Sequence, residues 1–295
     1  MQRPLGVNTW VWTSPLGDDS LLGIAERARG IGYELLELPV EVPGDWSPEL
    51  AAERLAGLEM GARVVGAMGA GRDLLDDELV RPTQEYLRHC VDVAVAVGSP
   101  TVAGPFTART GRVWRMDAAN RSAAVRQLRA GLRPVADYAA ERGVTLAIEP
   151  LNRYETSLLN TVEQALDALE PLLSSGGGAG GVGLALDAYH LNIEERSPAA
   201  AIRAAGNHTV VVQVCGNDRG PAGPDHTDWG AFLDALDSVG YDGPLTLESF
   251  TGDNDTIATA ASIWRPLAET QDELARVTYD FLTDLQQQRS TDNVA

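Results

Sequence analysis

The chain has 295 residues, 44% of them hydrophobic, which is long enough for one large domain or for two small ones. It carries 23 basic and 42 acidic residues, and the resulting charge of −19 argues against nucleic acid or an anionic membrane surface as a partner. With two cysteines, no secretory signal pattern at the start and no apolar run of the ~20 residues that cross a bilayer, the sequence predicts a cytoplasmic protein.

Apolar, strand-like segments alternate with amphipathic, helix-like segments along the whole chain. In order, the strand candidates are LGVNTWVW from Leu5, YELLELPV from Tyr33, ARVVGAMG from Ala62, TVAGPF from Thr101, VTLAIEPL from Val144, VGLALDAY from Val182, HTVVVQVC from His208 and GPLTLESF from Gly243. A helical pattern follows each one, and several of these patterns end at a glycine just before the next strand. Eight such units predict an α/β fold, a single-domain (β/α)8 TIM barrel, for which ~250 residues are typical. A doubly wound sheet is the competitor, but no G-x-G-x-x-G follows the first strand.

The barrel is expected to occupy residues 1–289, and residues 290–295 are expected to form a disordered tail. The glycine-rich stretch SSGGGAGG, from Ser174 to Gly181, is interpreted as a flexible loop before the sixth strand. Neither segment has the character of a linker between two domains.

Polar residues end the last four predicted strands, at the face of a barrel where active sites lie. They are Glu149, Asp187, Gln213 and Glu248. Three converging carboxylates would repel one another unless a cation lay among them. Gln213 lies in the apolar run VVVQVC, and a buried amide needs a partner because leaving it unpaired costs roughly 1–3 kcal/mol. An all-oxygen divalent metal site satisfies both demands, and it favours Mn²⁺ or Mg²⁺ over zinc.

The residues around these strand ends resemble a known family. The stretches are LAIEPLNRYETSLLNT (Leu146 to Thr161), LALDAYHLNIEE (Leu184 to Glu195), NDRGPAGPDHTDW (Asn217 to Trp229), GYDGPLTLESF (Gly240 to Phe250) and IWRP (Ile263 to Pro266). In order and spacing they are similar to the xylose-isomerase-like sugar epimerases, especially ketose 3-epimerases of the D-tagatose and D-psicose type. In the first half of the chain the resemblance is weak.

The resemblance implies a metal-dependent isomerase that moves a proton at the carbon next to a ketose carbonyl through an enediolate. Its metal, Mn²⁺ with Mg²⁺ or Co²⁺ as alternatives, would be held at positions 149, 187, 213 and 248, with Glu149 and Glu248 also acting as acid and base. Substrate oxygens would be contacted by Glu155, His190 and Arg219, although Arg219 could instead pair only with an acid such as Asp218.

The chain departs from the family at Gln213, where the epimerases have a histidine ligand. An amide oxygen is a weaker donor than imidazole, so metal affinity is the property most affected. Cys215 could serve as a substitute ligand or be a buried core residue, and His226 could approach the site or remain in its loop. Trp12 and Trp114 are expected to line the mouth of the pocket and bind substrate, together with Trp10 and Phe106, although each could be a core residue.

Three functions remain open at this point. The first is the ketose 3-epimerase acting on a sugar or sugar derivative, expected to form a homo-oligomer. The second is a lyase subunit similar to C-glycoside deglycosidases, which act on 3-oxo-glycosides and work with a small second subunit. The third is a non-catalytic barrel with a decayed metal site, against which the retained carboxylates argue.

Overall fold

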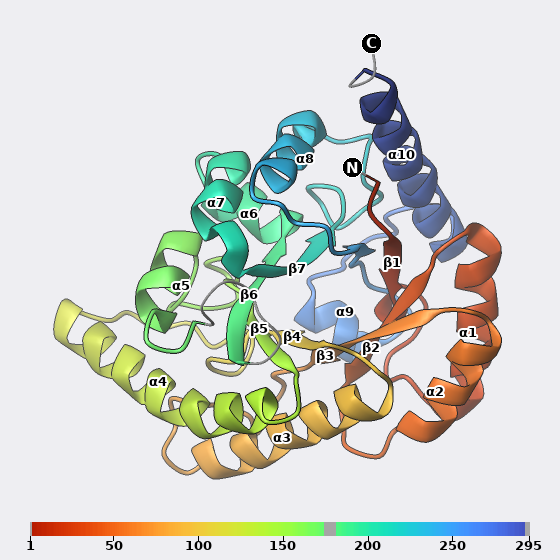
Figure 1. The fold of residues 1–295 in the computed structure, drawn as a ribbon. Helices are drawn as coiled ribbons and strands as arrows, with labels where there is room; N and C mark the ends of the chain where they lie inside the picture. Colours follow the sequence, from red (N-terminus) through yellow and green to blue (C-terminus); the bar gives the residue numbers. More distant parts are fainter. Residues whose placement is uncertain (1, 174–180, 293–295) are drawn as a thin grey trace.

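The structure is a computed structural model that describes residues 2–173 and 181–292. Eight parallel strands close into a barrel in sequence order, with β8 pairing to β1 (Figure 1). The strands are β1 (Leu5–Asn8), β2 (Leu35–Val40), β3 (Gly61–Gly66), β4 (Thr101–Gly104), β5 (Thr145–Ile148), β6 (Gly181–Asp187), β7 (Thr209–Val214) and β8 (Leu245–Leu247). The predicted single-domain TIM barrel is confirmed.

Helices surround the barrel (Figure 1). They are α1 (Asp18–Ile31), α2 (Pro48–Gly57), α3 (Val80–Ala96), α4 (Ala118–Ala140), α5 (Val162–Leu169), α6 (Ala188–Glu194), α7 (Pro198–Ala205), α8 (Trp229–Ser238), α9 (Asp255–Ala260) and α10 (Gln271–Asp292), with 3₁₀ turns η1 (Thr9–Val11) and η2 (Gly206–His208). Among the described residues, no helix is long and apolar enough to cross a membrane.

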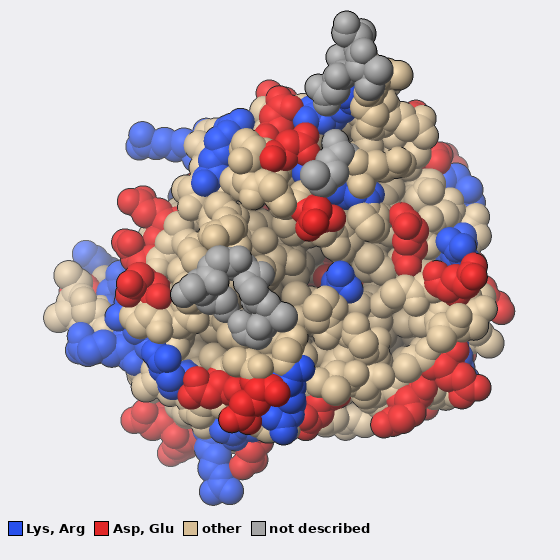
Figure 2. Space-filling model, in the orientation of Figure 1, with Lys and Arg blue, Asp and Glu red and all other residues tan. Residues whose placement is uncertain are grey.

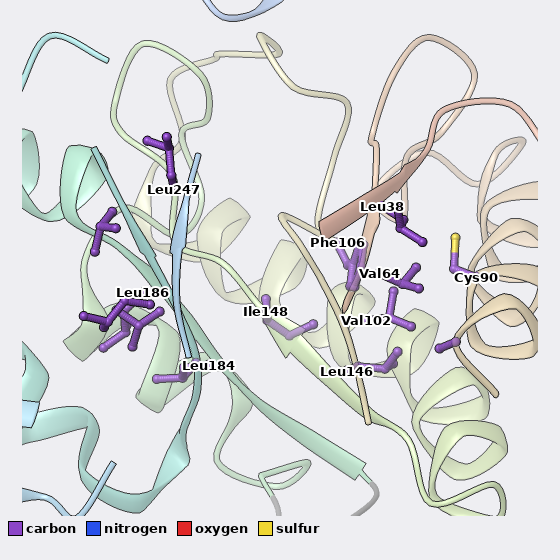
Figure 3. Packing of buried hydrophobic residues seen from close by; sticks show 14 of the residues in the cluster. Leu38, Val64, Cys90, Val102, Phe106, Leu146, Ile148, Leu184, Leu186 and Leu247 are labelled. Atoms are coloured by element: carbon purple, nitrogen blue, oxygen red, sulfur yellow. The ribbon is translucent and has the colours of Figure 1, made fainter. Parts of the chain in front are cut away.

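Side chains alternate across each strand, which separates two apolar layers. Outward-facing residues such as Val64, Val102 and Leu146 pack toward the helices, and Cys90 of α3 points into this layer (Figure 3). A second cluster is built from smaller inward-facing residues of the barrel, including Ala103 and Ala147. Because several inward positions hold alanine, namely Ala103, Ala147 and Ala185, room is left for polar groups at the carboxyl ends of the strands.

Two segments were expected to be irregular, the C-terminal tail and the glycine-rich loop before β6. Helix α10 continues to Asp292 and so includes the first residues of the expected tail, whereas residues 293–295 lie outside the described part of the chain. The helix is tied to the barrel by Gln286, whose side-chain oxygen accepts from the backbone N–H of Arg3 at 2.7 Å. Of the predicted glycine-rich loop, residues 174–180 lie outside the described part of the chain.

Candidate active site and metal centre

A cavity of about 400 Å³ opens at the carboxyl ends of the strands. Figure 2 shows one face of the molecule, on which acidic and basic side chains are interspersed around the rim. The titratable groups that line the cavity are Glu41, Arg109, Glu149, Glu155, His190, Arg219 and Glu248. Sequence analysis predicted most of these residues, and the fold brings them to one place.

Three predicted ligand carboxylates lie at this face and are at least 94% buried, with exposures of 6% for Glu149, 1% for Asp187 and 4% for Glu248. Glu149 and Glu248 follow the last residues of β5 and β8, and Asp187 ends β6. Asp187 also caps α6 by accepting from the backbone N–H of Tyr189 at 3.0 Å. The strand ends therefore place all three acids around one point.

Arg219 provides a cation inside this acidic group. Its Nη1 lies 2.5 Å from Asp187 Oδ2 and 3.0 Å from Glu248 Oε2. Its guanidinium carbon stacks over the ring of Tyr189 at 4.0 Å from the centroid, with the Phe250 ring at 5.2 Å on another side. Arg219 thus neutralises part of the charge that the sequence assigned to a metal ion alone.

The backbone holds Arg219 in this inward position. Its φ of 69° lies in the left-handed region, which is uncommon for a residue other than glycine. Ser249 Oγ donates to the Arg219 carbonyl oxygen at 2.6 Å. The alternative pairing with Asp218 does not occur, because Asp218 pairs with Arg265 at 2.6 Å.

His190 lies between the acids and a backbone donor. The N–H of Asn152 donates to His190 Nδ1 at 3.1 Å, so that nitrogen is an acceptor, and the proton of a neutral ring belongs on Nε2. Nε2 faces Glu149 at 3.4 Å and Asp187 at 3.6 Å. Arg219 Nη2 also lies 3.1 Å from Nε2, and we assign the tautomer from the backbone contact because a main-chain N–H cannot reorient. His190 is therefore placed as a donor toward oxygens at the site.

Gln213 finds its partners in two carboxylates. Its Nε2 donates to Glu37 Oε2 at 2.8 Å and to Glu248 Oε1 at 2.9 Å. Its amide oxygen has no hydrogen-bond partner within the described residues. The nitrogen of this buried amide thus has hydrogen-bond partners, whereas its oxygen has none within the described residues.

Burial dominates the titration of the acids. Desolvation raises the pKa of Glu149 well above its ordinary value, and the charges of Glu248 and Asp187 raise it further. Desolvation also raises the pKa of Glu248, although Arg219 acts against this rise. Burial lowers the pKa of His190, and the neighbouring Arg219 charge lowers it further. These acids hold their protons more tightly than usual unless a further cation is present.

The donor set fits a divalent cation. Glu149 Oε1 and Gln213 Oε1 are buried acceptors with no hydrogen-bond partner in the described chain, and a cation would satisfy both. Atoms of Glu149, Asp187 and His190 also lie within 4.8 Å of one another, the spacing of a possible metal site. Because Nδ1 of His190 accepts a hydrogen bond and leaves the proton on Nε2, the oxygens of positions 149, 187, 213 and 248 form the better set.

The tryptophans expected at the mouth of the pocket lie in different places. Trp12 and Trp114 are not among the residues that line the cavity, whereas Trp10 is. Residues Thr9–Val11 form a 3₁₀ turn, which breaks the strand alternation, and Trp12 Nε1 instead donates to Asp272 at 2.7 Å. Trp114 lies beside Arg112, whose guanidinium carbon is 4.7 Å from its ring centroid.

Two alternative ligands are also located. Cys215 is buried, with its Sγ 3.7 Å from Arg219 Nη1, and desolvation raises its pKa well above the ordinary value, which disfavours the thiolate that would bind a metal. His226 is exposed and contacts Asn192 Oδ1 at 2.9 Å. It is a loop residue outside the cavity lining.

Glu37 and Glu41 are two carboxyl groups that sequence analysis missed. Glu37 lies in the middle of the apolar strand β2, so the argument applied to Gln213 would also have identified it. Glu41 follows the same strand and lines the cavity, where it accepts from Trp10 Nε1 at 2.9 Å. Asn152, which donates to Glu155 at 2.7 Å, had no signal beyond its place in the loop after β5.

Comparison with known proteins decides the family. The model of the xylose isomerase-like TIM barrel family matches residues 25–276. The chain belongs to this family. It is 30% identical to an L-ribulose 3-epimerase of Methylomonas sp. (strain DH-1), over 94% of this chain and 96% of that protein, and 28% identical to a ketose 3-epimerase of Arthrobacter globiformis, over 95% and 96%.

Solved structures agree with these relatives. A structure of L-ribulose 3-epimerase superposes with a TM-score of 0.89 at 28% identity, covering 100% of this chain and 98% of that one. A D-allulose 3-epimerase from Methylomonas sp. in complex with D-allulose gives a TM-score of 0.84 at 27% identity, with coverage of 96% and 97%. The named homologues are ketose 3-epimerases, which are enzymes of the isomerase class.

Proposed function

We propose that this chain is a metal-dependent ketose 3-epimerase. The observation that carries the proposal is the meeting of Glu149 and Glu248 at one cavity, with Asp187 and the cationic Arg219 between them. Ketose epimerisation needs two acid/base groups and a means of stabilising negative charge on substrate oxygens. The homologues of similar length, among them one solved with D-allulose, support a ketose as the substrate class.

The residues divide the work according to their contacts. When bound, a divalent cation held by Glu149, Asp187, Gln213 and Glu248 would polarise the substrate oxygens and lower the cost of removing the carbon-bound proton. One glutamate takes the proton from one face of the substrate carbon, and the other returns a proton to the opposite face. Glu248 is held for this task by Gln213 and Arg219, one on each carboxylate oxygen.

The remaining groups bind and orient the sugar. His190 Nε2–H and the Arg219 guanidinium are donors for substrate oxygens, and Glu155 is an acceptor for substrate hydroxyls. Trp10 and Phe250, whose ring centroids are 5.4 Å apart, form part of the apolar wall. This wall limits the water that reaches the reacting carbon.

Deuterium uptake tests the proposal. With Mn²⁺ and L-ribulose or D-allulose in D₂O, the purified protein is expected to place deuterium at C3 and to form the C3 epimer, both visible by NMR. Release of an aglycone from a 3-oxo-glycoside, with no exchange in any ketose, would instead support the lyase reading and contradict the epimerase.

A further inference from the structure

Glu37 is a fully buried carboxyl group inside the barrel, below the cavity. Its neighbours on β2, Leu36 and Leu38, face outward into the main core, so Glu37 faces inward. Its Oε2 accepts from Asn8 Nδ2 at 2.9 Å and from Gln213 Nε2 at 2.8 Å. The residue is not among those that line the cavity.

These contacts fix the orientation of the Gln213 amide. An amide nitrogen carries two protons, and Gln213 gives one to Glu37 and the other to Glu248. A flipped amide would place its oxygen against two carboxylates. The oxygen is therefore held on the opposite side, where it has no partner among the described residues.

The chain of contacts continues on both sides of this pair. Asn8 is itself held, because its Oδ1 accepts from the backbone N–H of Trp10 at 2.9 Å. Hydrogen bonds thus run from β1 through Glu37 of β2 and Gln213 of β7 to Glu248, which follows β8. The interior of a TIM barrel is usually filled with branched apolar side chains, so this polar chain requires an explanation beyond packing.

We infer that Glu37 is a positioning residue for the reaction, which acts by orienting Gln213. It keeps the amide oxygen of Gln213 available to the metal, and through the amide nitrogen it holds the carboxylate of Glu248 in place. The inference rests on the proposed metal site and goes beyond it, because it assigns a role to a residue that is neither in the cavity lining nor a proposed ligand.

Three variants of Glu37 and one control test this role. Glu37→Met removes the hydrogen-bond acceptor, and Glu37→Asp moves the carboxylate away from Gln213. Both variants are expected to weaken Mn²⁺ binding by about 10–100-fold, which is the usual effect of losing a group that orients a metal ligand. Both are expected to lower kcat with little change in KM, because residue 37 is outside the cavity lining. Glu37→Gln keeps an acceptor oxygen and is expected to stay within about threefold of wild type. Glu34→Gln, an exposed change before the same strand, controls for loss of charge.

A double-mutant cycle shows whether Glu37 acts through Gln213. In a Gln213→Met background, Glu37→Met is expected to cause no further loss of Mn²⁺ affinity or kcat, because the amide it orients is gone. Losses that multiply in the double variant would overturn the inference. So would wild-type Mn²⁺ affinity in both Glu37→Met and Glu37→Asp. If Glu37→Met does not fold, the Glu37→Asp and Glu37→Gln pair decides alone.

The same titrations separate this inference from the proposed function. A wild type that binds Mn²⁺ and epimerises a ketose, beside an unchanged Glu37→Asp variant, removes only the positioning role. A wild type that binds no Mn²⁺ and exchanges no ketose proton contradicts the proposed function, and the role of Glu37 with it.

Discussion

The two halves of the barrel mouth are built from different chemistry. At β5, β6 and β8 the strands end in or are followed by Glu149, Asp187 and Glu248. β3 and β4 end in Gly66 and Gly104 and are followed by Ala67 and Pro105, which line the cavity without any charge. The Phe106 ring packs against both glycines so closely that an added Cβ would lie 2.8 Å and 2.5 Å from it. The ends of β3 and β4 therefore supply apolar shape, whereas β5, β6 and β8 supply the buried carboxyl groups, although the backbone follows the same plan in both.

This difference shows how a barrel confines reactivity to part of its rim. Val65 and Ala103 form the inward layer of the apolar half, next to Trp10 and Phe250. With low-dielectric groups on one side, the buried charges on the other interact more strongly than they would in water. The raised pKa values of Glu149 and Glu248, both caused mainly by burial, are a consequence of this arrangement.

The largest expected effect comes from removing a carboxyl group of the acidic half. Glu149→Gln and Glu248→Gln are each expected to reduce proton exchange at C3 by about 10²–10⁴-fold, the range of acid/base catalysis. Glu41→Gln, a carboxyl on the same cavity beside the first half of the barrel, is expected to change the rate less than about tenfold. Deuterium uptake measures all three, and near-wild-type exchange in Glu149→Gln or Glu248→Gln would leave that residue with a structural role only.

The next largest effect is a gain in metal affinity in the acidic half of the mouth. Gln213→His is expected to tighten Mn²⁺ binding by about 10–100-fold, because imidazole is the better donor and Glu37 can accept its other N–H. Activity can fall in the same variant if the amide is matched to its substrate. Calorimetric titration of metal into the two chelator-stripped proteins gives the answer, and equal affinities would mean that Gln213 is not a ligand.

A change in the apolar half is expected to affect stability and not metal binding. Val65→Ala removes two buried methyl groups, and we expect a loss of about 1–3 kcal/mol in the free energy of unfolding. Denaturant unfolding measures this loss. Mn²⁺ affinity is expected to remain at the wild-type value, and a tenfold weakening would show that the two halves are not separate in function.

The smallest effect concerns the cysteines. Burial raises the pKa of Cys90 to about 12, so at pH 8 roughly one thiol in ten thousand is ionised. The folded protein is therefore expected to react with a thiol reagent at this pH far more slowly than the unfolded chain. Fast labelling of Cys90, identified by mass spectrometry, would show that the helix layer around it opens easily.

The sequence predicted the residues whose location follows from the regular pattern of a strand, such as the polar residues at strand ends. Strand ends can be recognised from apolar periodicity, and the sequence therefore predicts that Glu149, Asp187 and Glu248 lie at one mouth. In the structure Glu149 and Glu248 line one cavity, and Arg219 contacts both Asp187 and Glu248. The prediction failed for Trp12 because a 3₁₀ turn replaces the strand there, which short-range alternation does not reveal. Arg219 reaches into the acidic group from a turn with positive φ, a conformation that no residue pattern in the stretch indicates.

Glu37 was missed for a different reason. Its signal, a polar residue within an apolar strand, was present in the sequence, but it lies in the half of the chain where the family resemblance is weak. Its partner Gln213 is 176 positions away, and only the closed barrel brings β2 and β7 residues together across the interior. Contacts of this kind depend on tertiary structure, whereas strand ends depend on local pattern.

Titration of Mn²⁺ into chelator-stripped protein, with thermal unfolding followed in parallel, tests the central claim that the acidic half of the mouth is a metal site. The account predicts about one Mn²⁺ bound per chain and a rise in melting temperature on binding. Metal binding and the rise in melting temperature are both expected to be lost in Asp187→Asn, because Asp187 is one of the proposed ligands. A wild type that binds no Mn²⁺ and melts at the same temperature with and without it would contradict the account.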